Sequence, residues 1–103
     1  MSPEGRLYRA ISDPTRRLLL DALMTGEKTA GELAEACPGS RPSASKHLKL
    51  LKQARLVSER RQGRNRIYSL DPAPLAEIDA WIQKYRVFWA SRLGRLKDYV
   101  ESD

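Results

Sequence analysis

Two short helical segments separated by Pro38-Gly39 most constrain how this chain can fold. The first begins at Thr29-Ala30-Gly31-Glu32, where the threonine and the glutamate have the spacing of a capping box. The second runs from Ser40, a possible cap, to Ala54. Helices this short, joined by a turn of about three or four residues, form a helix-turn-helix, which we predict over residues 29–54. Apolar residues recur at helical spacing in both segments: Ala30, Leu33, Ala34 and Cys37, then Ala44, Leu48 and Leu51.

The outward face of the second segment is basic and rich in hydrogen-bond donors. No acidic residue occurs between Arg41 and Ser58. A helix with an apolar stripe on one side and short polar or cationic side chains on the other suits the DNA major groove. An ordinary solvated amphipathic helix has the same pattern. The candidate DNA-contacting residues of this recognition helix are Arg41, Pro42, Ser43, Ser45, Lys46, His47 and Lys49.

The next stretch has the pattern of a basic β-hairpin. Residues 56–61 and 64–70 are compatible with strands around a turn at Gln62-Gly63. A helix-turn-helix followed by such a hairpin is a winged helix, with the wing over residues 56–70. Its cations would reach neighbouring phosphates or the minor groove, although charges also protect the edges of a solvated hairpin. The candidate wing residues are Arg60, Arg61, Arg64, Asn65 and Arg66.

Two further helices are expected before the capping box. A short one covers Glu4 to Ser12, with Leu7, Ala10 and Ile11 on one side. Asp13-Pro14 then supplies an N-cap and a first-position proline for a second helix that ends near Met24. We expect this second helix to bury Leu18, Leu19, Ala22 and Leu23.

A long last helix is predicted from Asp71-Pro72 to about Val100, over residues 72–100. Its apolar stripe has a second row of aromatic residues beside it (Trp81, Phe88, Tyr99), and the body of the protein is too small to cover both. A second copy of the chain would cover the excess; alternatively the aromatics complete the monomer core, or Tyr85, Phe88 and Trp89 line a small-molecule pocket. The expected dimer interface comprises Leu7, Ile11, Ile78, Ile82, Tyr85, Trp89, Leu93 and Leu96.

Length and charge limit the classes of protein that fit. The 103 residues suffice for one domain, residues 1–103, mostly α with a small β-hairpin and five helices. The net charge is +6, but residues 41–66 alone carry +8 and the remainder −2, as expected of a surface that binds a polyanion. No apolar run approaches the ~20 residues of a membrane span, and no signal peptide is evident, so a cytoplasmic protein is expected. A single cysteine excludes an internal disulfide.

Four sequence pieces together resemble the ArsR/SmtB type of bacterial winged-helix transcriptional repressor. They are A-I-S-D-P-T-R-R-L-L-L-D-A-L, T-A-G-E-L-A, S-R-P-S-A-S-K-H-L-K-L-L-K and L-V-S-E-R-R-Q-G-R-N-R-I-Y-S-L, and they cover most of residues 9–70. The resemblance implies a homodimer joined through the first and last helices. It also implies that Arg41, Pro42, Ser45 and Lys46 occupy the DNA-reading positions.

The metal chemistry of this family does not carry over. Its thiol sensors have a cysteine pair where this chain has Ala34 and Ala36, and the last helix contains no histidine. One Cys and one His do not assemble a three- or four-ligand site for a soft or borderline metal, so no cofactor is expected. Cys37 lies on a predicted buried stripe, so we expect it to serve as a small apolar residue, with a thiol or redox sensor as the alternative. Arg55 is a second departure, because the family usually has glycine there.

The predicted function is sequence-specific binding of double-stranded DNA by a homodimeric, metal-independent repressor that reads an inverted repeat. The main alternative is a winged helix that uses its basic hairpin to bind an acidic protein partner. RNA binding is disfavoured because the basic region lacks stacking aromatic residues. Catalysis is not expected, since His47 has no acid nearby and the serines lie on an outer face. The sequence identifies neither the operator nor a small-molecule effector.

Overall fold

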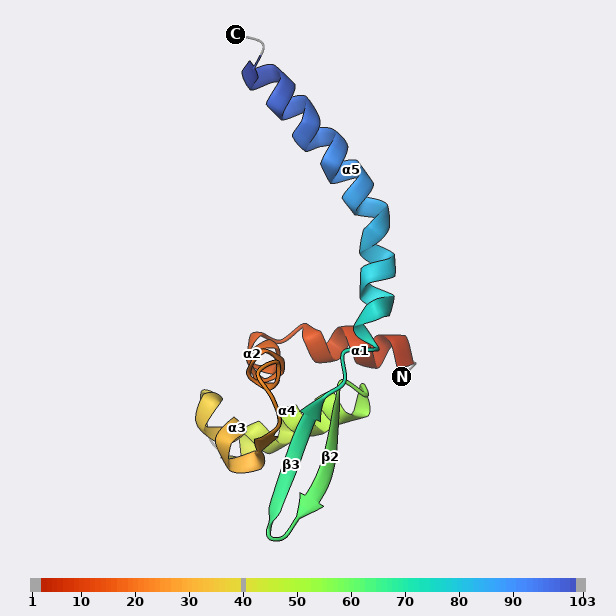
Figure 1. The fold of residues 1–103 in the computed structure, drawn as a ribbon. Coiled ribbons are helices and arrows are strands. Elements are labelled where there is room, and N and C mark those ends of the chain that lie inside the picture. Colours follow the sequence, from red (N-terminus) through yellow and green to blue (C-terminus); the bar gives the residue numbers. More distant parts are fainter. Residues whose placement is uncertain (1–2, 40, 102–103) are drawn as a thin grey trace.

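The computed structural model describes residues 3–39 and 41–101, and side chains for residues 5–39 and 41–94. It is a mostly helical winged helix-turn-helix with five helices and a small antiparallel sheet, which confirms the predicted fold (Figure 1). In chain order the elements are α1 (Pro3–Ile11), α2 (Pro14–Leu23), β1 (Lys28–Thr29), α3 (Ala30–Ala36), α4 (Arg41–Gln53), β2 (Val57–Gln62), β3 (Asn65–Leu70) and α5 (Leu75–Glu101).

Helix α4 lies at the centre of the body and packs against α1, α2, α3 and β2. Its predicted stripe of Ala44, Leu48 and Leu51 is buried, as are Leu33 and Cys37 from the predicted stripe of α3. The capping box at the start of α3 is present: the Glu32 backbone N–H donates to Thr29 Oγ1 (3.1 Å) and the Thr29 N–H donates to Glu32 Oε1 (2.9 Å). The local signals for the helix-turn-helix therefore specify both its boundaries and its buried faces.

The buried face of α2 differs from the prediction. Leu18 is 48 % exposed, and the buried side consists of Arg16, Leu19, Leu20 and Leu23. Hydrogen bonds from Arg16 to the end of α1 turn this side chain inward. Successive helical residues are separated by about 100°, so Leu18, two positions later, faces away. Because the buried stripe begins at the charged residue Arg16, apolar periodicity alone predicted the wrong buried face for α2.

The sheet is larger than predicted, because β1 adds a third strand in the order β1-β3-β2. β1 pairs only Lys28 with Tyr68 and Thr29 with Ile67, so it is too short to show a strand periodicity in the sequence. The hairpin register pairs Gln62 with Asn65, which moves the turn from Gln62-Gly63 to Gly63-Arg64. Gly63 has φ +62°, a backbone conformation that glycine adopts without steric cost.

Helix α5 starts at Leu75, three residues later than predicted. The Asp71 side chain accepts from the Ala73 N–H (3.1 Å), and the Leu75 N–H bonds to the Pro72 carbonyl (2.9 Å), so the chain makes tight turns before the helix begins. Pro74 contributes to the delay, because a residue that precedes proline is disfavoured in the helical region. The Asp-Pro pair therefore marks a turn here and a helix start at Asp13-Pro14.

Most of α5 projects from the body as an arm (Figure 1). The molecule measures 65 Å along its longest axis and its radius of gyration is 18.1 Å, against about 13 Å for a compact chain of this length. Leu75 and Ile78 at the root pack against the core. The arm leaves large apolar side chains exposed: Trp81, Tyr85, Val87, Phe88, Trp89 and Leu93.

The residues expected at the dimer interface differ in how far their side chains are buried within the protomer. Leu7 belongs to the protomer core, at 2 % exposure, so it presents little surface of its own to a partner. Ile11 and Ile78 are partly buried against that core, and Ile82 is half-buried. The short helix α1 packs against α4 of its own domain. Ser40 and the side chains of Leu96, Tyr99 and Val100 lie outside the described residues. No described helix is long and apolar enough to cross a membrane.

Arg55, in the turn after α4, has φ +62° and is the only non-glycine residue with positive φ in the part of the chain that is described. This conformation brings an L side chain close to the following carbonyl. We expect Arg55→Gly to raise the free energy of unfolding by about 1 kcal/mol. Arg55→Ala keeps a Cβ atom and is expected to change it by less than about 0.5 kcal/mol. Denaturant unfolding of both variants measures this; equal stabilities would contradict a backbone cost at this position.

Candidate nucleic-acid interface

The outer face of α4 presents the predicted recognition residues largely as expected. Pro42, Lys46 and Lys49 are exposed on the side opposite the buried stripe, and Arg41 and Ser45 are exposed at its edge. Ser43 and His47 are half-buried. Since the stripe fixes the rotation of α4 about its own axis, the exposed donors and cations are held outward along one surface.

The wing lies beside this surface. Arg66 of β3 lines a hollow of about 210 Å³ together with Arg41 and Ser45 of α4. A second hollow, of about 250 Å³, is lined by Arg66 with Ser45 and Lys49. The helix-turn-helix and the hairpin, which are separate in the sequence, therefore form one continuous surface on which Arg66 is central.

The hairpin has two chemically different faces. Cross-strand partners share a face, so the register places Arg61 opposite Arg66 and Glu59 opposite Tyr68 on the side that looks toward α4. Arg60 pairs with Ile67 and lies on the other face. There it forms an ion pair with Glu27 and donates to Gln62 Oε1 (3.3 Å). Arg64 is in the turn, and Asn65 pairs with Gln62.

A network of side chains fixes the wing to α4. The Tyr68 hydroxyl donates to Glu59 Oε2 (2.7 Å), and Glu59 Oε1 accepts from Lys52 Nζ of α4 (3.4 Å). The hydrogen bond from Tyr68 lowers the pKa of Glu59, and the Lys52 charge lowers it further. Burial and the neighbouring Glu59 raise the pKa of Tyr68 to about 12. Sequence patterns did not predict this network, because its members come from α4, β2 and β3. The relative placement of these three elements is not specified by local sequence.

Several cations of the surface are not neutralised by neighbours. Within the described residues, Arg41, Lys46, Lys49, Arg61 and Arg64 form no ion pair. Lys52 and Arg60, by contrast, are paired with Glu59 and Glu27. These five unpaired cations of α4 and the wing can contact phosphates without first breaking an internal ion pair.

The inner edge of α4 holds a second group that sequence patterns missed. The His47 ring faces Arg16 and Asp13, with Nδ1 at 3.3 Å from Arg16 Nη1 and 3.9 Å from Asp13 Oδ2. The statement that His47 has no acid nearby is therefore wrong, since the start of α2 brings Asp13 to it. Asp13 also caps α2: the Arg16 backbone N–H lowers the pKa of its carboxyl, and the Arg16 and His47 side chains lower it further.

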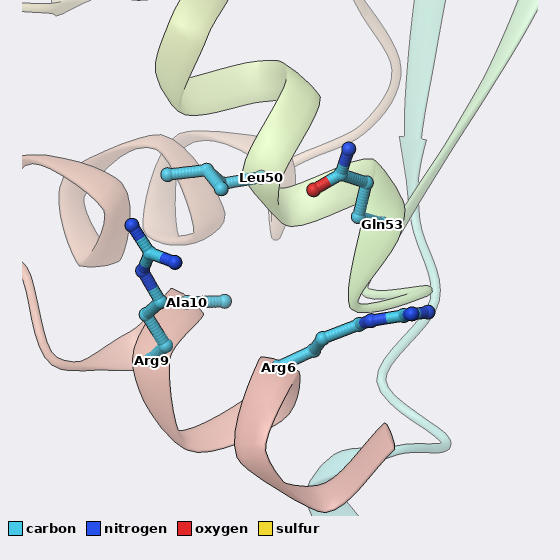
Figure 2. A pocket seen from close by; sticks show the side chains of 5 residues that line it. All are labelled: Arg6, Arg9, Ala10, Leu50 and Gln53. Atoms are coloured by element: carbon cyan, nitrogen blue, oxygen red, sulfur yellow. The ribbon is translucent and has the colours of Figure 1, made fainter. Parts of the chain in front are cut away.

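A small hollow of about 110 Å³ lies between α1 and α4. Figure 2 shows Arg6 and Arg9 of α1 extending toward the end of α4, where Gln53 and Leu50 lie, with Ala10 below Leu50 in this view. Two cations beside the end of a helix lie near its partly negative carbonyls. The hollow is small and lies away from the exposed donors of α4, so we assign it to helix packing.

Comparison with known proteins agrees with this geometry. A helix-turn-helix domain family matches residues 11–60. The chain is 40% identical to the HTH-type transcriptional regulator Rv2034 of Mycobacterium tuberculosis over 102 residues, which are 99% of this chain and 92% of that protein. It is 44% identical to the transcriptional repressor SdpR of Bacillus subtilis over 81 residues, which are 79% of this chain and 90% of that protein. An ArsR-like transcriptional regulator from Rhodococcus sp. RHA1 superposes with a TM-score of 0.69 at 30% identity, covering 98% and 95% of the two chains.

A basic helix-turn-helix flanked by a wing defines a DNA-binding transcriptional regulator, and these relatives are regulators rather than enzymes. The chain belongs to the ArsR/SmtB family of winged helix-turn-helix transcriptional regulators.

The shifted pKa of Tyr68 predicts how wing stability depends on pH. A tyrosine whose pKa is 10.0 in the unfolded chain and about 12 in the folded one contributes its full stability below pH 10 and loses it as pH rises to 12. We therefore expect the free-energy difference between wild type and Tyr68→Phe to shrink by about 2 kcal/mol over that interval. Glu59→Gln removes one cause of the raised pKa of Tyr68, so it should narrow the pH range over which this stability is lost. A difference that is constant with pH would contradict this assignment.

Proposed function

We propose that the protein represses transcription as a homodimer that occupies an inverted-repeat operator, with no metal ion as its trigger. The observation that carries this proposal is the joint surface of α4 and the wing. There Ser45 and Lys46 are exposed at the helix face, and Arg66 lines the same hollows as Ser45. Small donors on a major-groove helix read base edges, while flanking arginines contact phosphates.

In this proposal the residues of the surface have distinct roles. Arg41, Ser45, Lys46 and Lys49 face the major groove, with Pro42 and Ser43 at the helix start. Arg61, Arg64, Asn65 and Arg66 of the wing contact the neighbouring backbone or minor groove. Arg60, which is paired with Glu27 on the opposite face, positions the wing and contributes less to DNA contact.

The exposed arm of α5 supports the dimer. Tyr8 and Trp81 stack edge to face with centroids 6.1 Å apart, and Trp81 meets Tyr85 at 5.4 Å, so a partly exposed aromatic cluster joins α1 to α5. Farther along the arm, Trp89 and Leu93 are more than half exposed. Monomeric proteins rarely expose apolar surface of this extent. A winged helix-turn-helix domain from Mycobacterium bovis, 25% identical with a TM-score of 0.66 over 98% of this chain and 84% of that one, is described as homodimeric.

The chemistry of the thiol and the imidazole supports independence from metal. Cys37 is buried and its Sγ lies 3.6 Å from the Pro38 carbonyl oxygen. His47, the only histidine in the sequence, already contacts Arg16. Among the residues that the structure describes, no three His, Cys, Asp or Glu side chains gather as metal ligands. A soft metal would therefore have to displace core packing or an existing charged contact to find ligands.

Selection of bound sequences from random duplex DNA tests the function. We expect a symmetric consensus whose half-sites lie about one helical turn apart, because a two-fold dimer places its recognition helices at that spacing. Ser45→Ala and Lys46→Ala should each weaken binding to the consensus by about 1–3 kcal/mol and relax preference at one position of each half-site. No enrichment would favour the alternative, a winged helix that binds an acidic protein partner.

Trp89→Asp is the control for the dimer in that experiment. A buried, unpaired carboxylate at the interface should reduce the sedimenting mass to that of a monomer and abolish the symmetry of the selected sites. Gln83→Asp introduces the same charge on α5 at a polar, exposed position and should leave the mass unchanged. An unchanged mass for Trp89→Asp would place the interface elsewhere.

The salt dependence of binding tests the wing. Arg64→Ala should weaken binding to all sequences alike and reduce the slope of log affinity against log salt by about one unit for each protomer engaged. Arg60→Ala is the matched control, because it removes a cation that Glu27 already pairs, and a smaller change is expected. Equal slopes for wild type and Arg64→Ala would show that the wing does not clamp phosphate.

A further inference from the structure

Arg16 is the one buried charged residue in the part of the chain that is described, and the DNA-binding surface does not include it. Its Nε donates to the Ala10 carbonyl (2.7 Å) and its Nη2 to the Arg9 carbonyl (2.8 Å), both in the last turn of α1. A guanidinium at a helix C-terminus is stabilised by the unpaired carbonyls and by the helix dipole. The third contact, from Nη1 to His47 Nδ1 at 3.3 Å, joins α1 and α2 to α4.

This contact is compatible with one state of the imidazole. A guanidinium can only donate hydrogen bonds, so a hydrogen bond from Arg16 requires Nδ1 of His47 as the acceptor. A ring that accepts at Nδ1 is neutral and carries its proton on Nε2. Within the described residues, the ring makes its hydrogen bond only through Nδ1. His47 thus connects the outer face of α4 to the buried Arg16 by the nitrogen that points inward.

We propose that Arg16 is a positioning residue that holds α4 in its DNA-reading orientation through neutral His47, and that protonation of His47 releases this hold. The inference rests on the proposed function and assigns the regulation of the same surface. It treats His47 as an internal contact of α4, in place of the direct DNA contact expected from the sequence.

The chemistry of the release follows from the three charged groups that surround the ring. A protonated Nδ1 becomes a donor, so it loses the hydrogen bond from Arg16 and faces a second cation at 3.3 Å. Asp13 Oδ2, at 3.9 Å, is the acceptor within reach. The same oxygen accepts the Arg16 backbone N–H at 3.1 Å and caps α2. A protonated His47 that turns toward Asp13 would therefore share this oxygen with the Arg16 backbone N–H at the start of α2.

The other elements packed on α4 bring no further charged group into a described contact with the ring. From α1, Arg9 lies beside Leu50, one helical turn along α4 from His47 (Figure 2). No described charged side chain of α3 or β2 forms an ion pair with His47. The charged groups in described contact with the ring are therefore Arg16 and Asp13, both from the start of α2.

The sign of the pH effect distinguishes this role from direct contact with DNA. Imidazole is the side chain that changes charge between about pH 5 and 8. If His47 positions α4 through Arg16, protonation weakens DNA binding. If His47 instead contacts a phosphate, protonation adds a cation to the interface and strengthens binding.

Two isosteric variants separate the ring nitrogens. In His47→Asn the amide oxygen lies near the position of Nδ1 and can still accept from Arg16, whereas in His47→Gln the amide lies near Nε2. At pH 8 we expect His47→Asn to bind the selected duplex within about twofold of wild type, and His47→Gln to bind about tenfold more weakly, as for loss of one charge-assisted hydrogen bond. Wild-type affinity should fall from pH 8 to 6, while that of His47→Asn stays constant.

Two results would overturn the proposal. One is the reverse order, in which His47→Gln binds like wild type, or equal affinities for the two variants. The other is wild-type affinity that rises or stays level as the pH falls. Arg16→Lys keeps the charge but loses most of the hydrogen bonds, and it should bind as weakly as His47→Gln; melting curves show whether each variant is folded.

A measurement without DNA separates this inference from the proposed function. The nitrogen chemical shifts of His47 in the free protein should report the Nε2–H tautomer at pH 8. Amide exchange in α4, corrected for intrinsic rates, should quicken from pH 8 to 6 in wild type and not in His47→Asn. If the tautomer and the pH-dependent exchange are observed but selection from random DNA enriches no sequence, the proposed function is refuted and the positioning contact still holds. An Nδ1–H tautomer, or exchange in α4 that does not respond to pH, would refute the contact itself.

Discussion

The burial of one narrow stripe on α4 is the constraint on which the rest of the structure depends. Ala44, Leu48 and Leu51 are nearly inaccessible, and each of the surrounding elements α1, α2, α3 and β2 packs against this helix. A helix rotated by one residue would move its apolar side chains out of the core and its lysines into it, at a cost of several kcal/mol for each buried charge. Core packing therefore decides which side chains face solvent, and the functional surface is the complement of the core.

Hydrogen-bonded and charged contacts add the precision that apolar packing does not supply. Arg16 joins the end of α1 to α4, and Lys52, Glu59 and Tyr68 join α4 to the wing. Arg16 and Tyr68 are buried, and contacts of such side chains are stronger than contacts at the surface, whereas Lys52 remains exposed. The cations left without partners are those that face outward. The protein thus separates charges that maintain its shape from charges available to a polyanion.

The sequence allowed most of the fold to be predicted, for reasons that are local. Helix caps such as Thr29 with Glu32, breaks such as Pro38-Gly39, and apolar spacing in α3 and α4 depend on residues within a few positions of one another. The errors occur where distant contacts override these signals. Arg16 begins the buried stripe of α2 because α1 supplies its acceptors, and β1 exists only because β3 provides a partner. Of the candidate site, the outward face of α4 could be predicted, whereas the separate roles of Arg60 and Arg66 required the register of the hairpin.

The arm of α5 has a consequence for how such a regulator responds to its own abundance. This helix of 27 residues extends beyond the body and leaves large apolar side chains exposed instead of burying them in its own core. Under the proposed dimer, the fraction of assembled protein depends on total concentration, because association is a second-order process. Two half-sites are occupied together only by the assembled form. The fraction of operator that is occupied would then rise more steeply than in proportion to the number of protein copies. A modest dilution of the protein during cell growth would, for the same reason, lower this fraction more than in proportion.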